Sequence, residues 1–149
     1  MKSYAHIFVH KVIYAKVVTE ADKQEMRLEM ATRLIVIRSL KTFVKPNLRL
    51  RVMPIKTNCQ QFFQMRKIPK ADRRRLRYYF SEREMKILDY VAAHNNMRAY
   101  ALIRQLLFYH FAFPNPQETE QMFLNSFSDV FSEKDFTNST PTPIFLDII

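Results

Sequence analysis

A short basic stretch, residues 75–80, alternates two kinds of side chain. In an extended strand, one face would carry Arg75, Arg77 and Tyr79. The opposite face would carry an apolar set, namely Leu76, Tyr78 and Phe80. Guanidinium groups donate hydrogen bonds in a fixed fork that matches planar acceptors such as a guanine edge or a phosphate. The segment therefore predicts a binding strand, with one face for the core and one face for a ligand.

No catalytic constellation accompanies these residues. The chain of 149 residues has no glycine, which excludes the Walker loop, the dinucleotide fingerprint and the nucleophile elbow. A single cysteine, Cys59, excludes an internal disulfide and a cysteine-cluster zinc site. The one i,i+4 histidine pair, His6 and His10, has no carboxylate near it before Glu20. We expect no enzymatic activity, no cofactor and no metal site.

The charge is strongly positive and unevenly distributed. The whole chain has a formal net charge of +10. Residues 1–113 hold 23 Lys/Arg and 8 Asp/Glu (23 − 8 = +15), whereas residues 114–149 hold 1 and 6 (1 − 6 = −5). A basic body indicates a polyanionic partner such as a nucleic acid. No apolar run reaches the ~20 residues that span a bilayer, so we expect a cytoplasmic protein without membrane contact.

Two helices are expected directly after the strand. Ser81 and Glu84 have the spacing of a capping box, which begins a helix at the end of the strand. The turn 94–96 contains Asn96, a residue type that tolerates the left-handed conformation. Residues 97–112 predict a second helix, whose unpaired first-turn amides would favour a phosphate beside Arg98. The expected phosphate contacts are Lys70, Arg73, Arg74, Asn96 and Arg98.

The strand has no partner within residues 65–113, so we expect two copies of the chain to pair their strands in an antiparallel ribbon. A two-stranded ribbon fits the major groove of DNA, where arginine binds guanine. Arg75, Arg77 and Tyr79 would contact the bases. The apolar faces would form a shared dimer core, comprising Leu76, Tyr78, Phe80, Leu88, Ile103 and Leu107.

The rest of the chain is expected to form extensions of this module. Residues 1–64 predict an N-terminal extension with a helix at about 20–44, capped by Thr19 and Asp22; for residues 4–18 strand and helix both stay open. Met65 is an alternative start, because a basic arm follows it directly. Residues 114–149 predict an acidic C-terminal helix, at 117–133, and a tail. The expected fold class is mainly α, with the module at 65–113.

Residues 66–112 resemble the ribbon-helix-helix superfamily of DNA-binding proteins, and within it the small plasmid-mobilisation (relaxosome accessory) proteins. The resemblance is carried by the arm KIPKADRRR, the strand LRYYF, the helix start SEREMKIL, Ala92, and AYALIRQLL with its Ile103-Arg104 pair. It implies a homodimer that binds double-stranded DNA in a relaxosome or as a transcriptional repressor. A relaxase or another DNA-processing protein is the further partner that it implies.

Two other interpretations compete with this one. The segment 80–96 is similar to the opening of helix-turn-helix regulators, although the helix that follows is apolar and suits a core better than a groove. A basic RNA-binding or interaction protein without catalytic activity would also account for the charge, through phosphate attraction alone.

Overall fold

The computed structural model describes residues 3–114 and 141–143. Helices dominate these residues, which confirms the mainly α prediction. The elements are, in chain order, β1 (Ser3–His10), α1 (Lys11–Lys23), α2 (Leu28–Phe43), β2 (Pro54–Lys56), β3 (Arg73–Phe80), α3 (Glu82–His94), α4 (Ala99–Ala112) and β4 (Pro141–Pro143). Three short 3-10 helices connect β2 to β3, at Thr57–Phe62, Met65–Lys67 and Lys70–Asp72.

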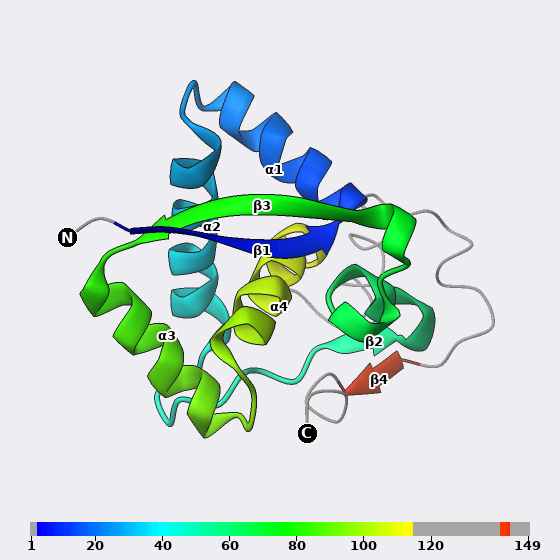
Figure 1. Cartoon of the computed structure of the whole chain (residues 1–149). Helices are drawn as coiled ribbons and strands as arrows, with labels where there is room; N and C mark the ends of the chain where they lie inside the picture. The colour runs from blue at the N-terminus through cyan, green and yellow to red at the C-terminus, as the bar shows by residue number, and fades with distance from the viewer. Residues whose placement is uncertain (1–2, 115–140, 144–149) are drawn as a thin grey trace.

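The central feature is a two-stranded ribbon. β1 and β3 pair in antiparallel fashion over their full lengths, from Ser3 opposite Phe80 to His10 opposite Arg73. The ribbon lies across the front of the molecule, with α2 and α4 behind it, α1 above it and α3 below it (Figure 1). A second, smaller sheet joins β2 to β4. The strand predicted from the alternation at 75–80 is confirmed as part of β3.

The strand has no partner within residues 65–113, as predicted, but it has one elsewhere in the same chain. Its partner is β1, which belongs to the segment expected to be a separate extension. Ile7 and Val9 point into the core, while His6 and Phe8, which alternate with them along the strand, are exposed. Because Phe8 is apolar although it lies on the outer face, the sequence of β1 lacks the alternation of apolar and polar residues that is typical of a half-buried strand. The homodimer therefore loses the physical reason on which it was based, and stays an untested prediction.

The helix predicted at about 20–44 is two helices. α1 begins at Lys11, because the imidazole of His10 accepts a hydrogen bond from the amide of Val12 and caps the helix. Thr19 lies within α1, so the predicted cap at this position is wrong. The chain turns after Lys23 through Glu25, whose φ of 53° is left-handed. α2 then runs from Leu28 to Phe43.

The strand and two helices of the N-terminal part recur in the C-terminal part with a shift of 71 residues. α1 and α3 correspond end to end (82 − 11 = 71 and 94 − 23 = 71). The shift also relates the N-caps of the first helices, His10 and Ser81, and of the second helices, Arg27 and Arg98. The left-handed residues of the two turns, Glu25 and Asn96, correspond in the same way, with φ of 53° and 56°.

Hydrogen bonds in the two turns repeat as well. The amide of Met26 donates to the carbonyl of Ala21 at 3.0 Å, and the amide of Met97 donates to the carbonyl of Ala92 at 3.1 Å. Side-chain identity is sparse, so the repeat is not evident from the sequence; identical pairs include Ala21/Ala92, Met26/Met97, Arg27/Arg98 and Arg33/Arg104. A pseudo-two-fold axis therefore relates the two halves of the chain. It passes through the ribbon between His6 and Arg77, which face each other and are 71 residues apart.

One hydrophobic core joins both halves. It includes Ile7, Ile13 and Ile35 from the first half together with the six residues expected in a dimer core, all of them buried: Leu76, Tyr78, Phe80, Leu88, Ile103 and Leu107. The connector between the halves adds buried residues of its own, Phe62 and Phe63 among them. A boundary at residue 65 would therefore divide a single core, and residues 1–64 are not an appendage to it.

The C-terminal predictions fall mostly outside the described residues. The acidic helix expected at 117–133 lies there entirely, and of the tail only β4 is described. None of the helices in the described ranges is long and apolar enough to cross a membrane.

Candidate nucleic-acid interface

The outward face of β3 carries the three side chains singled out for base contact. Arg75 and Arg77 are exposed and Tyr79 is half-buried. The inward face carries Leu76, Tyr78 and Phe80, and burial raises the pKa of the Tyr78 phenol. The predicted division between a core face and a polar face is thus confirmed in β3. Which ligand the polar face binds stays a prediction.

β1 contributes a second row of side chains that sequence reasoning missed. His6 lies opposite Arg77, and Phe8 lies opposite Arg75. Both β1 residues are exposed, with 46% of Phe8 accessible. The face therefore combines two guanidinium groups with an imidazole and a phenyl ring.

The basic arm before β3 has both structural and exposed cations. Arg73 is half-buried, and its Nε donates to the carbonyl of Ile68 at 3.0 Å. This contact anchors the arm, so the expected phosphate role of Arg73 would compete with a structural one. Lys70 and Arg74 are exposed at the end of the ribbon where His10 pairs with Arg73. These two side chains extend the positive surface beyond the ribbon.

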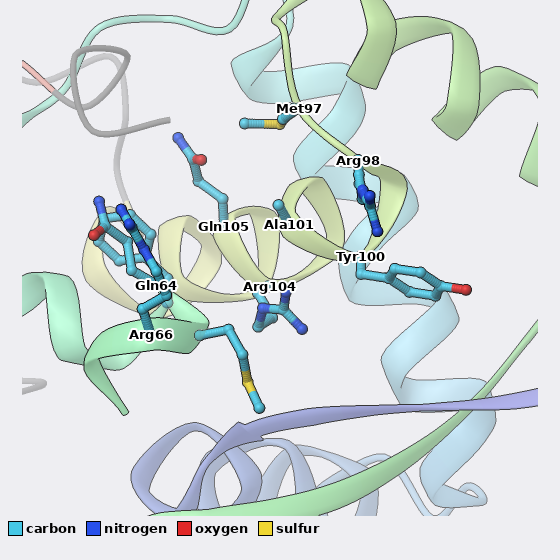
Figure 2. A pocket seen from close by; sticks show the side chains of 10 residues that line it. Gln64, Arg66, Met97, Arg98, Tyr100, Ala101, Arg104 and Gln105 are labelled. Atoms are coloured by element: carbon cyan, nitrogen blue, oxygen red, sulfur yellow. The ribbon is translucent and has the colours of Figure 1, made fainter. Parts of the chain in front are cut away.

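The N-terminus of α4 lies beside a cavity of about 360 Å³ with a strongly basic lining. Figure 2 shows Arg66, Arg98 and Arg104 around it, together with Tyr100. Arg98 is the exposed N-cap residue, and no side chain caps the helix. The first-turn amides of α4 are therefore available for an anion. Asn96, in the turn between α3 and α4, is exposed and has the left-handed conformation predicted for it.

Arg104 is the least solvated cation of this cavity. Burial lowers its pKa, and its Nε is buried without a hydrogen-bond partner. Its Nη1 donates to the carbonyl of Phe8 at a long 3.5 Å. The side chain points from α4 toward β1 (Figure 2). This guanidinium is half-buried, and no carboxylate of the described residues is paired with it, which favours an anion at this edge of the ribbon.

Arg33 occupies the corresponding position in the first half, and its surroundings differ. Its guanidinium binds Glu84 through two hydrogen bonds, Nε to Oε1 at 2.9 Å and Nη2 to Oε2 at 2.6 Å. The pair is largely screened from solvent, and it raises the pKa of Arg33 and lowers that of Glu84. In the part of the chain that the structure describes, Arg33 has a carboxylate partner and Arg104 has none, so the two edges of the ribbon differ in charge there.

In the described part of the chain, no group of three or more His, Cys, Asp and Glu side chains is arranged so that it could hold a metal ion. The face and cavity described above supply hydrogen-bond donors and cations instead. No protein-family model matches this chain, and neither does any curated protein or solved structure. The resemblance to ribbon-helix-helix proteins therefore stays a prediction.

Proposed function

We propose that the protein binds double-stranded DNA in a sequence-specific manner, through the outer face of the β1–β3 ribbon in the major groove. The observation that carries this proposal is a two-stranded ribbon with one face on the core and the other exposing Arg75 and Arg77. The major groove, about 12 Å wide, admits a two-stranded ribbon, and a guanine edge offers arginine two acceptors. Tyr79, His6 and Phe8 complete the face that would meet the bases.

Phosphate contacts on either side of the groove would hold the ribbon in position. Lys70 and Arg74 are suited to one such contact, since both are exposed at an end of the ribbon. Arg98 and the first-turn amides of α4 are suited to another. Contacts of this kind position a protein on the duplex, whereas base contacts provide the specificity.

The burial of α4 favours this arrangement over a helix-turn-helix. A recognition helix must present a polar face to the groove. In α4 the side chains that would have to do so are fully buried, among them Leu102, Leu106 and Tyr109. Withdrawing this helix from the core would expose much of its apolar surface. The ribbon needs no such rearrangement.

The biological role that we propose follows from the resemblance. A cytoplasmic protein of this kind would act at a transfer origin, as a relaxosome accessory protein with a relaxase as partner, or at a promoter, as a repressor. Both roles require the same recognition of a short duplex site. The DNA-binding step is therefore the one to test first.

The test measures affinity for a selected duplex site and for random duplex. Arg77→Ala should weaken binding to the selected site by about 1–3 kcal/mol, the value of one bidentate base contact, and weaken binding to random duplex much less. Arg98→Ala should weaken both by similar amounts and flatten the salt dependence. Lys41→Ala serves as a control, because this exposed residue lies in the last turn of α2 and not on the ribbon. Equal affinity for RNA and DNA, with no preferred sequence, would contradict the proposal.

A further inference from the structure

The pseudo-two-fold symmetry of the ribbon is broken at the positions that face outward. In a ribbon made by two identical chains, corresponding positions carry the same side chain, so the two halves bind the same bases and select an inverted repeat. Here one chain provides both strands. The 71-residue shift relates Arg77 to His6, Arg75 to Tyr4, and Tyr79 to Phe8.

The strand register places both exposed arginines toward one end of the ribbon. Arg77 lies opposite His6 at the centre, and Arg75 lies opposite Phe8 on one side of it. On the other side, Tyr79 lies opposite Tyr4. Arg77 places a guanidinium group at the centre and Arg75 places one on one side, whereas β3 carries Tyr79 on the other side. A symmetric site cannot match such a face, since Arg75 on one side and Tyr79 on the other offer different hydrogen-bond donors.

The positive charge beside the ribbon is also greater at the Arg75 end than at the other end. Lys70 and Arg74 are exposed near the Arg75 end. Arg104 lies against the carbonyl of Phe8, and within residues 3–114 no carboxylate is paired with it. Its counterpart Arg33 is neutralised by Glu84, which is placed just after the opposite end of β3. Positive charge therefore gathers at the end that already carries Arg75.

We infer that a single copy of the chain binds a DNA site that is not an inverted repeat, with guanines at the centre and on one side only. This inference rests on the proposed function and names the class of duplex that the same face selects. Phe8, beside Arg75, favours a thymine methyl group next to the outer guanine, because an apolar side chain can contact it. The two phosphate flanks bind with unequal strength, the stronger one on the guanine side.

The first experiment is a selection of the full chain on random duplexes, followed by the stoichiometry of the complex with the enriched sequence. We expect one enriched motif without internal two-fold symmetry and one chain per duplex. An inverted repeat that holds two chains would overturn this inference while supporting the proposed function. Absence of any enriched duplex would overturn the proposed function, and the inference with it.

A symmetrised ribbon gives the second measurement. The triple variant Tyr4→Arg, His6→Arg and Phe8→Tyr gives β1 the residues that β3 carries at the corresponding positions. It should gain about 5- to 150-fold in affinity for the inverted repeat built from the guanine half of the selected site, the equivalent of one bidentate contact. Ile87→Arg with Tyr90→Arg adds the same charge on exposed positions of α3 and should give no such preference. Far-ultraviolet circular dichroism verifies that both variants are folded; a folded triple variant that still prefers the original site would overturn the inference.

Discussion

Arg33 and Glu84 join the two halves of the chain at the level of single residues. Glu84 accepts two hydrogen bonds from the guanidinium of Arg33 and one from the backbone amide of Ser81, at 2.8 Å. Ser81 Oγ in turn accepts from the amide of Glu84 at 3.1 Å. One carboxylate thus closes the capping box of α3 and anchors α2 to it. The hydrogen bonds from Arg33 are the main reason why the pKa of Glu84 lies below its ordinary value of 4.5.

Glu84→Gln should lower the free energy of unfolding by about 1–3 kcal/mol at pH 7, because charged hydrogen bonds within a largely buried pair are lost. Since the folded protein depresses the pKa of Glu84, the stabilisation is present above pH 4.5 and is lost as the pH falls through the lowered pKa. The difference between the two proteins should therefore shrink in acid. Urea unfolding at a series of pH values measures it.

The matched control is Glu82→Gln, two residues earlier. Glu82 is 79% exposed and lies 3.7 Å from Lys86 in an i,i+4 pair. Exposed pairs of this kind contribute about 0.3–0.5 kcal/mol. If both substitutions had the same small effect, the Arg33–Glu84 pair would not stabilise the fold.

The sequence could predict only the local part of this arrangement. Ser81 and Glu84 are three residues apart, a spacing that indicates a capping box, and the prediction is confirmed. Arg33 is 51 residues away from Glu84, and no periodicity in either helix connects them. The contact follows from the way α2 crosses behind the ribbon. Such tertiary contacts depend on the complete fold and are invisible to local patterns.

At the scale of elements, the α1–α2 turn and the α3–α4 turn have the same backbone conformation but use different residues for it. Each turn needs one residue in the left-handed conformation, and the chain contains no glycine to supply it. Asn96 adopts this conformation readily, since a short polar side chain can bond locally. Glu25 lacks that advantage, so its backbone is strained by about 1–2 kcal/mol.

Glu25→Gly should therefore stabilise the protein by roughly 0.5–1 kcal/mol, after the greater freedom of glycine in the unfolded chain is subtracted. Asn96→Gly, at the corresponding position of the other half, should change the stability much less. Thermal unfolding compares the two variants directly. Thr19→Gly, within α1, should destabilise by about 0.3–0.5 kcal/mol and shows the effect of glycine where no left-handed residue is needed. A loss of stability in Glu25→Gly would mean that the carboxylate contributes more than the backbone strain costs.

The elements of the second half were predictable and those of the first half were largely not. β3, α3 and α4 have clean alternation, a capping box and an asparagine turn. In the first half, His10 caps α1 although histidine is not a common cap, and Glu25 ends the turn although glutamate is not a common left-handed residue. The two halves share an architecture, but the second half alone has the capping and turn residues that are typical of it.

At the scale of the whole molecule, the first half, whose elements were largely not predictable, changes the assembly expected for the ribbon from two chains to one. β1 satisfies the backbone groups along one edge of β3, and α2 covers the apolar face of the ribbon together with α4 (Figure 1). A ribbon that would need two chains in a simple strand-helix-helix protein is complete within one. The symmetric core was predictable residue by residue, since Leu76, Leu88 and Leu107 are all buried. Its origin in a single chain was not.

The melting temperature should consequently be independent of protein concentration. If folding required two chains, a hundredfold dilution would reduce the apparent stability by about 2.7 kcal/mol through mass action, which lowers the melting temperature by several degrees. Pairing of β1 with β3 within the chain removes this dependence, because the closing of the ribbon is intramolecular. Thermal unfolding followed by circular dichroism over a hundredfold range of concentration measures it. A melting temperature that rises steadily with concentration would show that two copies stabilise each other, and the homodimer would then be favoured again over the single-chain ribbon as the unit that binds its partner.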